Sequence, residues 1–281
     1  MKIGRTYSLD WAAYELIDAG TDKKLERWGD IITIRPERQA YFKPGTPVEE
    51  WEEIAHLEFV PEGRMSGKWI HHKKHIETPW EIQFQSLTFQ LEPTKYKHIG
   101  LFPEQITNWK IINDFLQPEM KMLNLFAYTG AASIVGRSKG ADVTHVDSVK
   151  SLISWGRKNM ELSGLEDIRW VHDDAIKFAN REVKRGNTYD LIVMDPPSYG
   201  VGVKNEKWKI EHQLESLIET ASKLLKKGGL LILNTYSPKM KEKQIHYFLN
   251  KHFKTVETSE LWKKTYTNKH LFYGHLARAY K

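Results

Sequence analysis

The stretch of this chain best suited to chemistry is residues 190–200, which read Asp-Leu-Ile-Val-Met-Asp-Pro-Pro-Ser-Tyr-Gly. The apolar run 191–194 predicts a buried parallel strand, and the two prolines after Asp195 cannot continue it. They hold Asp195 at the carboxyl end of the strand, where open α/β sheets bind ligands. Asp195 and the Pro196 carbonyl are then fixed acceptors with Tyr199 as a nearby flat face. This set suits a planar group that carries an amino group.

The elements around this stretch alternate between helical and strand patterns from about residue 100. We predict helices over 104–117, 130–139, 149–163, 174–184, 208–226 and 240–250. We predict strands over 121–126, 142–147, 168–172, 190–194, 229–235, 254–258 and 270–278. Such alternation indicates an α/β fold with a doubly wound, Rossmann-like parallel sheet.

Residues 1–99 differ in texture and predict a small β-rich N-terminal domain, with residues 100–281 as the second domain. Residues 30–35 show an alternating pattern, and residues 82–91 predict one half-buried antiparallel strand. Pro44, Gly45, Pro47, Pro61 and Gly63 mark turns between such strands.

Polar or small residues follow three other predicted strands of the second domain. Small residues around Gly130 follow the strand at 121–126 and allow a close backbone approach to a ligand at a helix start. Asp147 ends the next strand, where a carboxylate can accept from ribose hydroxyls, although it could also cap the following helix. Asp173 and Asp174 follow the third strand, where a carboxylate can accept from an adenine amino group, although it could also cap the following helix. The Gly228–Gly229 turn before the fifth strand is mainly architectural.

Taken together and in this order, these signals resemble the class I S-adenosylmethionine-dependent methyltransferases over roughly residues 100–281. Among them, the chain is similar to bacterial large-subunit ribosomal RNA methyltransferases that carry a small N-terminal β domain. The run Gly100-Leu101-Phe102-Pro103-Glu104-Gln105, with Asn108 and Trp109, also resembles that group. The resemblance implies a seven-stranded sheet whose last strand is antiparallel.

The resemblance also implies roles for individual residues. The turn with Asn124, Ala127, Tyr128, Thr129 and Gly130 would face the methionine part of the cofactor, together with Gln105 and Asn108. Asp147 and Ser148 would hold the ribose, and Asp173, Asp174 and Ala175 would meet the adenine. The catalytic candidates are Asp195, Pro196, Pro197, Ser198 and Tyr199, and Asp195 also borders the cofactor.

The chain departs from the family pattern at four positions. Asn124 stands where an acid is usual, and Phe126 and Tyr128 replace two usual glycines, so the methionine amino group is expected to be held differently. Ser198 stands in the usual place of the aromatic that stacks on the target, and Tyr199 follows it. The missing Gly-x-Gly-x-x-Gly pattern argues against a nicotinamide enzyme.

Composition narrows the chemistry further. The chain has no cysteine, which excludes disulfides, thiolate metal sites and the cysteine adduct used for carbon-5 methylation of pyrimidines.

His71, His72 and His75 have a spacing that could bind a metal, but the adjacent lysines disfavour a cation, and we expect no metal site. There is no apolar run of membrane-spanning length and no secretory core at the start, so we expect a cytoplasmic protein without a membrane partner.

Charge points toward a polyanion. The net charge is +6, and residues 239–281 hold ten Lys and Arg against three Glu, interleaved with aromatic residues. That segment could bind RNA or could be a solvated face over core aromatics. The leading hypothesis is a methyltransferase that acts on a base nitrogen in RNA, most reasonably ribosomal RNA, with S-adenosylhomocysteine as the product. The alternatives are a protein or small-molecule methyltransferase, and a non-catalytic RNA-binding protein on the same fold.

Overall fold

The structure is a computed structural model that describes residues 4–63, 66–73 and 76–281. By contact density the chain divides into two units. The first comprises residues 1–6, 107–261 and 273–281, and the second comprises residues 7–106 and 262–272. Because the strands β16 and β17 are long, the tip of the hairpin that they form belongs to the second unit.

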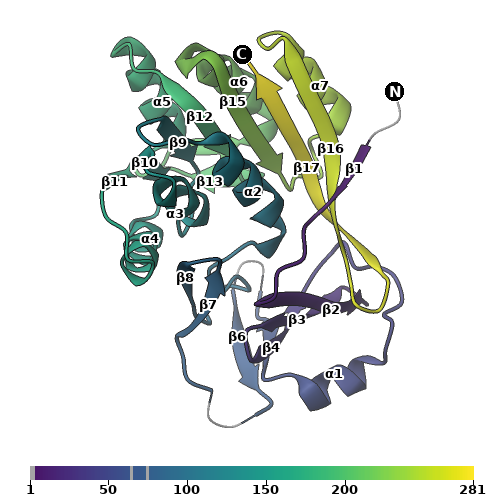
Figure 1. The fold of residues 1–281 in the computed structure, drawn as a ribbon. Coiled ribbons are helices and arrows are strands. Elements are labelled where there is room, and N and C mark those ends of the chain that lie inside the picture. Colours follow the sequence, from purple (N-terminus) through teal and green to yellow (C-terminus); the bar gives the residue numbers. More distant parts are fainter. Residues whose placement is uncertain (1–3, 64–65, 74–75) are drawn as a thin grey trace. The chain divides into compact units, whose positions relative to one another are not determined.

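The first unit is built on a mixed sheet of eight strands among the described residues (Figure 1). Their order is β1 (Gly4–Tyr7), β16 (Thr255–Lys264), β17 (His270–Tyr280), β15 (Leu225–Thr235), β12 (Tyr189–Met194), β9 (Lys121–Leu125), β10 (Asp142–Asp147), β11 (Ile168–His172). The five strands from β15 to β11 run parallel, and β17 is antiparallel to β15. The predicted doubly wound sheet with an antiparallel last strand is thus confirmed.

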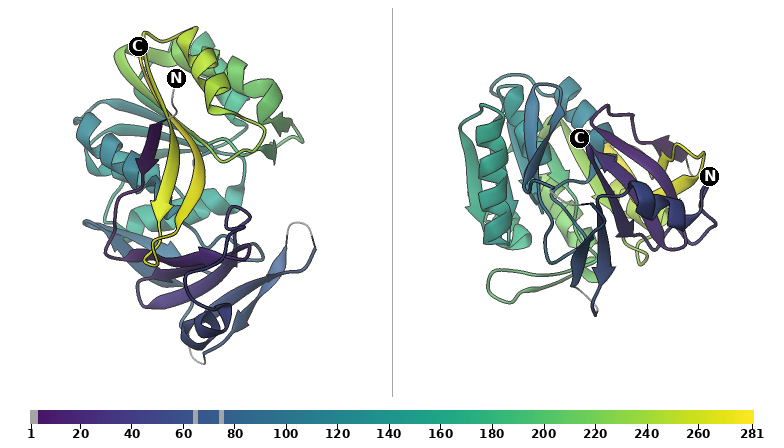
Figure 2. Two further views of the ribbon diagram at one scale, coloured as in Figure 1. Left: turned by 90° about the vertical axis from the view of Figure 1, so that its right-hand side faces the viewer. Right: turned by 90° about the horizontal axis from the view of Figure 1, so that it is seen from below.

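The sheet has one strand more than the seven expected from the sequence. The extra strand is β1, which lies at the edge beside β16, and the left view of Figure 2 shows it alongside the two long C-terminal strands. Only four residues long and exposed over most of its length, β1 has no run of alternating apolar residues that would have predicted it.

Helices cover both faces of this sheet. They are α2 (Ile106–Phe115), α3 (Ala131–Ser138), α4 (Lys150–Leu162), α5 (Ala175–Lys184), α6 (Ile210–Leu224) and α7 (Glu242–Asn250), and the short η1 (Pro103–Gln105) that precedes α2 belongs to the second unit. Alternate residues of β9 face opposite sides. Leu123 and Leu125 join the large apolar core with α5, α6 and α7, whereas Met122 lies against Gly136 of α3. None of the described helices is long and apolar enough to cross a membrane.

The second unit contains a five-stranded sheet, β2 (Tyr14–Gly20), β3 (Lys23–Trp28), β4 (Ile31–Pro36), β5 (Leu57–Pro61), β6 (Gly67–His71), with α1 (Val48–Ile54) between β4 and β5. Its interior holds an ionic cluster in which the Arg35 guanidinium and Lys24 both pair with Glu26. Burial raises the pKa of Glu26, but these two cations outweigh it and leave the pKa at about 2.

Residues 82–91 do not form one strand, as the sequence suggested, but belong to a hairpin of β7 (Trp80–Phe84) and β8 (Leu87–Leu91). The chain turns at Gln85, which takes a positive φ of 55°. Buried residues fall at 82 and 84 and then at 87, 89 and 91. The three-residue step from Phe84 to Leu87 breaks the alternation, and this break marks the turn.

Candidate functional site

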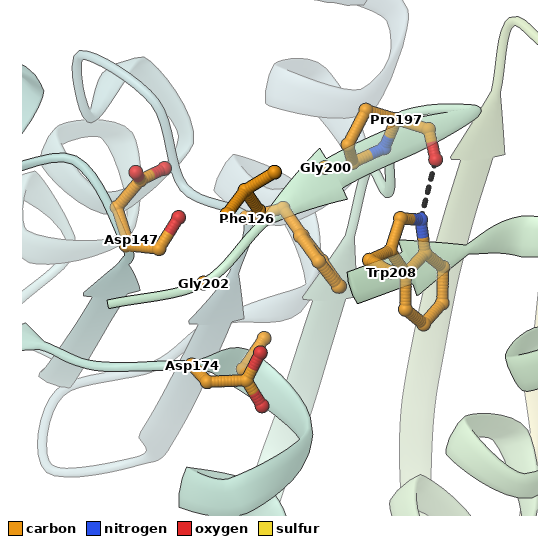
Figure 3. Close-up of a pocket in the computed structure, with 10 residues that line it drawn as sticks. Phe126, Asp147, Asp174, Pro197, Gly200, Gly202 and Trp208 are labelled. Carbon is orange, nitrogen blue, oxygen red and sulfur yellow. Dashed lines mark hydrogen bonds between the residues drawn. The ribbon is translucent and has the colours of Figure 1, made fainter. Parts of the chain in front are cut away.

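A hollow lies at the carboxyl ends of the parallel strands in the first unit and, together with the open solvent at its mouth, comprises about 360 Å³ (Figure 3). The ends of β9, β10, β11 and β12, or the segments that follow them, contribute to its wall, as expected for an open α/β sheet. The lining residues are Phe126, Asp147, Ser148, Asp174, Ala175, Pro197, Gly200, Val201, Gly202 and Trp208. Five of the residues predicted from the sequence are therefore brought together here.

Asp147 ends β10 and is 8% exposed. Its Oδ2 accepts from the backbone N–H of Tyr128, and its Oδ1 accepts from the backbone N–H of Val149, both at 2.9 Å. Burial raises the pKa of Asp147, and these backbone N–H groups oppose the rise. A carboxylate has about four acceptor positions, so two bonds leave capacity for hydroxyl donors in the hollow.

Asp174 performs the capping role and also lines the hollow. Its Oδ1 accepts from the backbone N–H of Lys177 at 2.9 Å and caps α5. In contrast, Asp173 binds the backbone N–H of Asp174 and the guanidinium of Arg181, so its carboxylate is directed to its own helix. Of the two adjacent acids, Asp174 is the one that meets the hollow.

The turn after β9 has the left-handed backbone typical of a glycine-rich turn, although only one of its three left-handed residues is glycine. Phe126 and Tyr128 take φ values of 56° and 53°, and Gly130 takes 85°. The left-handed conformation costs a non-glycine residue about 1–2 kcal/mol. The turn is nevertheless fixed, because Ala127 donates to the Val146 carbonyl and the Thr129 carbonyl accepts from Asn159.

The remaining predicted residues lie outside the wall of the hollow. Asn124 is 4% exposed and donates its amide to Ser133 of α3 at 2.9 Å, so it lies on the face of the sheet that α3 covers. Ser133 in turn contacts Nδ1 of His145, whose pKa burial lowers to about 3. Asn108 is buried within α2, and Gln105 belongs to the second unit.

Asp195 and Pro196 directly follow β12, and Asp195 is partly buried. The register of β12 against β15 pairs Met194 with Leu233, so the next residue, Asn234, neighbours Asp195. The Asn234 amide donates to Asp195 Oδ1 at 3.3 Å. Burial raises the pKa of Asp195 to about 6, and this hydrogen bond opposes the rise.

After Ser198 the structure differs from the prediction, which placed no strand there and began a helix at residue 208. The chain there forms a two-stranded ribbon, β13 (Tyr199–Val201) and β14 (Lys207–Lys209), and α6 begins only at Ile210. The indole N–H of Trp208 in β14 donates to the Pro197 carbonyl at 2.5 Å and so joins β14 to the residues that precede β13 (Figure 3).

Sequence reasoning missed Phe126, Trp208 and the ribbon residues 200–202 as parts of the wall. The Phe126 and Trp208 rings lie 5.1 Å apart between centroids. In Figure 3 the Gly200–Gly202 segment runs between the side chains of Asp147 and Asp174. One signal could have revealed the ribbon: Lys207-Trp208-Lys209 alternates charged and apolar residues, which is typical of a half-buried strand.

The aromatic residues of the basic C-terminal segment are divided between core and surface. Phe248, Phe253 and Tyr273 are at most 9% exposed, whereas Tyr247 and Tyr266 are 60% and 81% exposed. Two of its lysines pair with α6 acids, Lys239 with Glu211 and Lys251 with Glu215. The segment therefore serves the packing of the fold to a large extent.

No group of three metal-ligating side chains occurs within the described ranges. His72 is instead paired with Glu58 at 3.1 Å. His75, the third histidine of the spacing, lies outside the described residues.

Comparison with known proteins agrees with this geometry. A solved S-adenosylmethionine-dependent methyltransferase from Agrobacterium tumefaciens is 33% identical, covers 98% of this chain and 93% of its own, and superposes with a TM-score of 0.93. A second structure, complexed with S-adenosylhomocysteine, is 17% identical with a TM-score of 0.70, over 92% of this chain and 72% of that chain, and shares the fold.

Curated relatives match over shorter stretches. Ribosomal RNA large subunit methyltransferase K/L of Shewanella frigidimarina is 30% identical over 54% of this chain and 22% of that protein. Ribosomal RNA large subunit methyltransferase K of Neisseria meningitidis is 31% identical over 51% of this chain and 41% of that protein. The matched region thus spans less than half the length of either relative.

A family model described as S-adenosylmethionine-dependent methyltransferase matches residues 56–250, which is more than half of the chain. The matched region contains the hollow, both of its carboxylates and the Asp195-Pro196-Pro197 motif. The chain belongs to the family of S-adenosylmethionine-dependent methyltransferases.

Proposed function

We propose that this chain transfers the methyl group of S-adenosylmethionine to an amino nitrogen of a base in RNA, with ribosomal RNA as the expected source. The observation that carries the proposal is the position of Asp195-Pro196-Pro197 at the end of β12, with Pro197 in the wall of the hollow. The relatives named as ribosomal RNA methyltransferases and the net charge of +6 support an RNA substrate. Such a substrate would place the protein in the cytoplasm.

The hollow fits the adenosine part of the cofactor. Asp147 has acceptor capacity left for the two ribose hydroxyls, and Asp174 offers a carboxylate to the adenine amino group. Phe126 supplies an aromatic wall. Of the predicted binding residues that lie outside the wall of the hollow, Asp173 stays a proposal for the adenine, and those predicted for the methionine end stay proposals for that end.

When bound, the cofactor supplies a methyl group on a sulfonium, which becomes a thioether as the carbon–sulfur bond breaks and the carbon–nitrogen bond forms. The protein's contribution is therefore to position the nucleophile. Asp195 and the Pro196 carbonyl would accept the two N–H bonds of the target amino group and aim its lone pair at the methyl group. The Pro197 carbonyl is already occupied by Trp208.

Asp195 can also act as the base in the last step, the deprotonation of the methylated nitrogen. With a pKa near 6, it is mostly ionised at neutral pH and can accept the proton that the methylated nitrogen must lose. A nitrogen target is favoured because the chain has no cysteine for a carbon-5 adduct.

The test is transfer of labelled methyl from S-adenosylmethionine to total RNA from cells that lack this protein. We expect label in RNA, and digestion to nucleosides would name the modified atom. Label in protein or in small molecules instead would contradict the RNA assignment. Binding of S-adenosylhomocysteine without transfer to any of the three would favour a non-catalytic protein.

A further inference from the structure

The ribbon formed by β13 and β14 has two different faces. Its register pairs Tyr199 with Lys209, Gly200 with Trp208 and Val201 with Lys207. Because side chains alternate across a strand, the central pair points to one side of the ribbon and the two outer pairs point to the other.

The face with the central pair is occupied by the protein itself. Trp208 is 5% exposed, donates to the Pro197 carbonyl and contacts the Phe126 ring. Gly200 lies in the wall of the hollow, where a larger residue would meet Pro197 and Trp208. This face therefore closes the cofactor site.

The opposite face, which we call the outer face, consists of Tyr199, Val201, Lys207 and Lys209 and is open to solvent, and of these four residues Val201 also borders the hollow. Tyr199 and Val201 are 55% and 48% exposed, and both lysines are exposed. Within the described part of the chain, no acid lies within ion-pair distance of either lysine. The ribbon's own acid, Glu206, is paired with Lys177 of α5.

Resting on the proposed function, we propose that the outer face is the docking surface for the single-stranded RNA segment that flanks the target base. Proteins bind single-stranded RNA by stacking aromatic side chains on bases and placing cations near phosphates, and this face offers both on adjacent positions. The cross-strand pairs put Tyr199 beside Lys209 and Val201 beside Lys207.

Position along the chain supports the same partner. Tyr199 follows Asp195 by four residues, so their Cα atoms are at most about 14 Å apart. A nucleotide next to a base held at Asp195 therefore lies within reach of the outer face. The uncompensated positive charge of the two lysines complements a phosphate backbone.

The lysines are tested with the double variant Lys207→Ala/Lys209→Ala. Its affinity for poly(U) and for ribosomal RNA from cells lacking the protein would be measured across salt concentrations. We expect about tenfold weaker binding at low salt and a shallower salt dependence, by about 1.4 in the log–log slope for two lost phosphate contacts. Binding of S-adenosylhomocysteine and the rate at saturating RNA should stay unchanged.

Tyr199 is tested separately with Tyr199→Ala. We expect RNA binding to weaken about 5- to 150-fold, as for the loss of one stacked base, with the salt slope unchanged. The matched controls are Lys158→Ala on α4 and Tyr247→Ala on α7, which remove an exposed lysine and an exposed tyrosine elsewhere on the same unit. Both controls should bind RNA like the wild type.

RNA affinity and salt slope that stay at wild-type values in the ribbon variants would overturn the docking proposal while leaving the proposed function intact. Failure of the wild-type protein to bind or methylate RNA would instead defeat the proposed function. If the wild type methylates a protein and the ribbon variants lose that activity, the outer face serves a protein partner and the RNA proposal is wrong.

Discussion

The turn after β9 and the segment after β12 leave neighbouring strands at the same edge of the sheet, yet they are built in opposite ways. The first is five residues, 126–130, tied to the body of the sheet by backbone and amide hydrogen bonds. The second runs over residues 195–209, and its contacts with the rest of the unit include the Asn234–Asp195 hydrogen bond, the packing of Trp208 on Phe126 and the Lys177–Glu206 ion pair.

This difference separates two tasks. The short turn fixes the wall against which an invariant cofactor can be bound. Its left-handed residues are strained, and the surrounding hydrogen bonds hold them in that conformation. The longer segment carries the target-binding motif and then a two-faced ribbon, so it can recognise a substrate with its outer face while closing the cofactor site. Loops placed by a rigid scaffold commonly carry function in this way.

The largest expected effect comes from removing the acceptor at the start of the longer segment. Asp195→Ala should lower methyl transfer by about 100-fold or more, because positioning of the nucleophile is the main catalytic contribution. Binding of S-adenosylhomocysteine, measured by calorimetry, should persist because Asp147 and Asp174 remain. Unchanged turnover in this variant would remove Asp195 from the site.

On the cofactor side, Asp147→Ala should weaken S-adenosylhomocysteine binding by about 1–3 kcal/mol, roughly 5- to 150-fold, through lost charge-assisted hydrogen bonds. The same change leaves the Tyr128 and Val149 N–H groups without their acceptor, so part of the loss arises from a loosened turn. Asp147→Asn restores an acceptor and should recover part of the affinity. Equal affinity of Asp147→Ala and wild type in calorimetry would place the ribose elsewhere.

The pH profile tests the ionisation of Asp195. Burial raises its pKa to about 6, so the carboxylate is ionised above that pH and protonated below it. A protonated acid is a poorer acceptor, and kcat/KM, which reports the free enzyme, should fall about tenfold per pH unit below pH 6. In Asp195→Asn the residual activity should lose this acidic limb. An acidic limb that persists in Asp195→Asn would assign it to another group.

The same two regions also differ in how well the sequence predicted them. The strands β9 to β12 and the positions of Asp147, Asp174 and Asp195 at their ends were predictable because long apolar runs and helix periodicity fix element type. The ribbon was not, since its strands are three residues long and depend on tertiary contacts of Trp208. The direction of Asn124 also depended on packing, because period-2 alternation does not say which face of β9 meets α3.

Gly202, at the end of the ribbon's first strand, offers a test of how closely the ribbon covers the hollow. A Cβ at this position would lie 2.6 Å from Glu206 Oε2 and 3.0 Å from Asp174 Oδ2. Because both atoms end flexible side chains, Gly202→Ala should displace the Glu206 and Asp174 carboxylates and weaken S-adenosylhomocysteine binding by about threefold to tenfold. The double variant Gly202→Ala/Glu206→Ala removes the nearer obstacle and should regain affinity. Full affinity in Gly202→Ala would show that the ribbon does not bear on Asp174.

The smallest expected effect concerns the ion pair between Glu206 and Lys177. The pair joins the ribbon to α5, and the hydrogen bond from Lys177 holds the pKa of Glu206 well below its usual range. Because the pair is solvent-exposed, Glu206→Gln should raise the dissociation rate of S-adenosylhomocysteine by less than about threefold, and less still at high salt. Glu219→Gln, which breaks the exposed Glu219–Lys223 pair on α6, is the matched control and should have no effect. An increase of tenfold or more in Glu206→Gln alone would mean that the ion pair, and not Trp208, holds the ribbon over the cofactor. The longer segment would then differ from the turn after β9 in being fastened by charge.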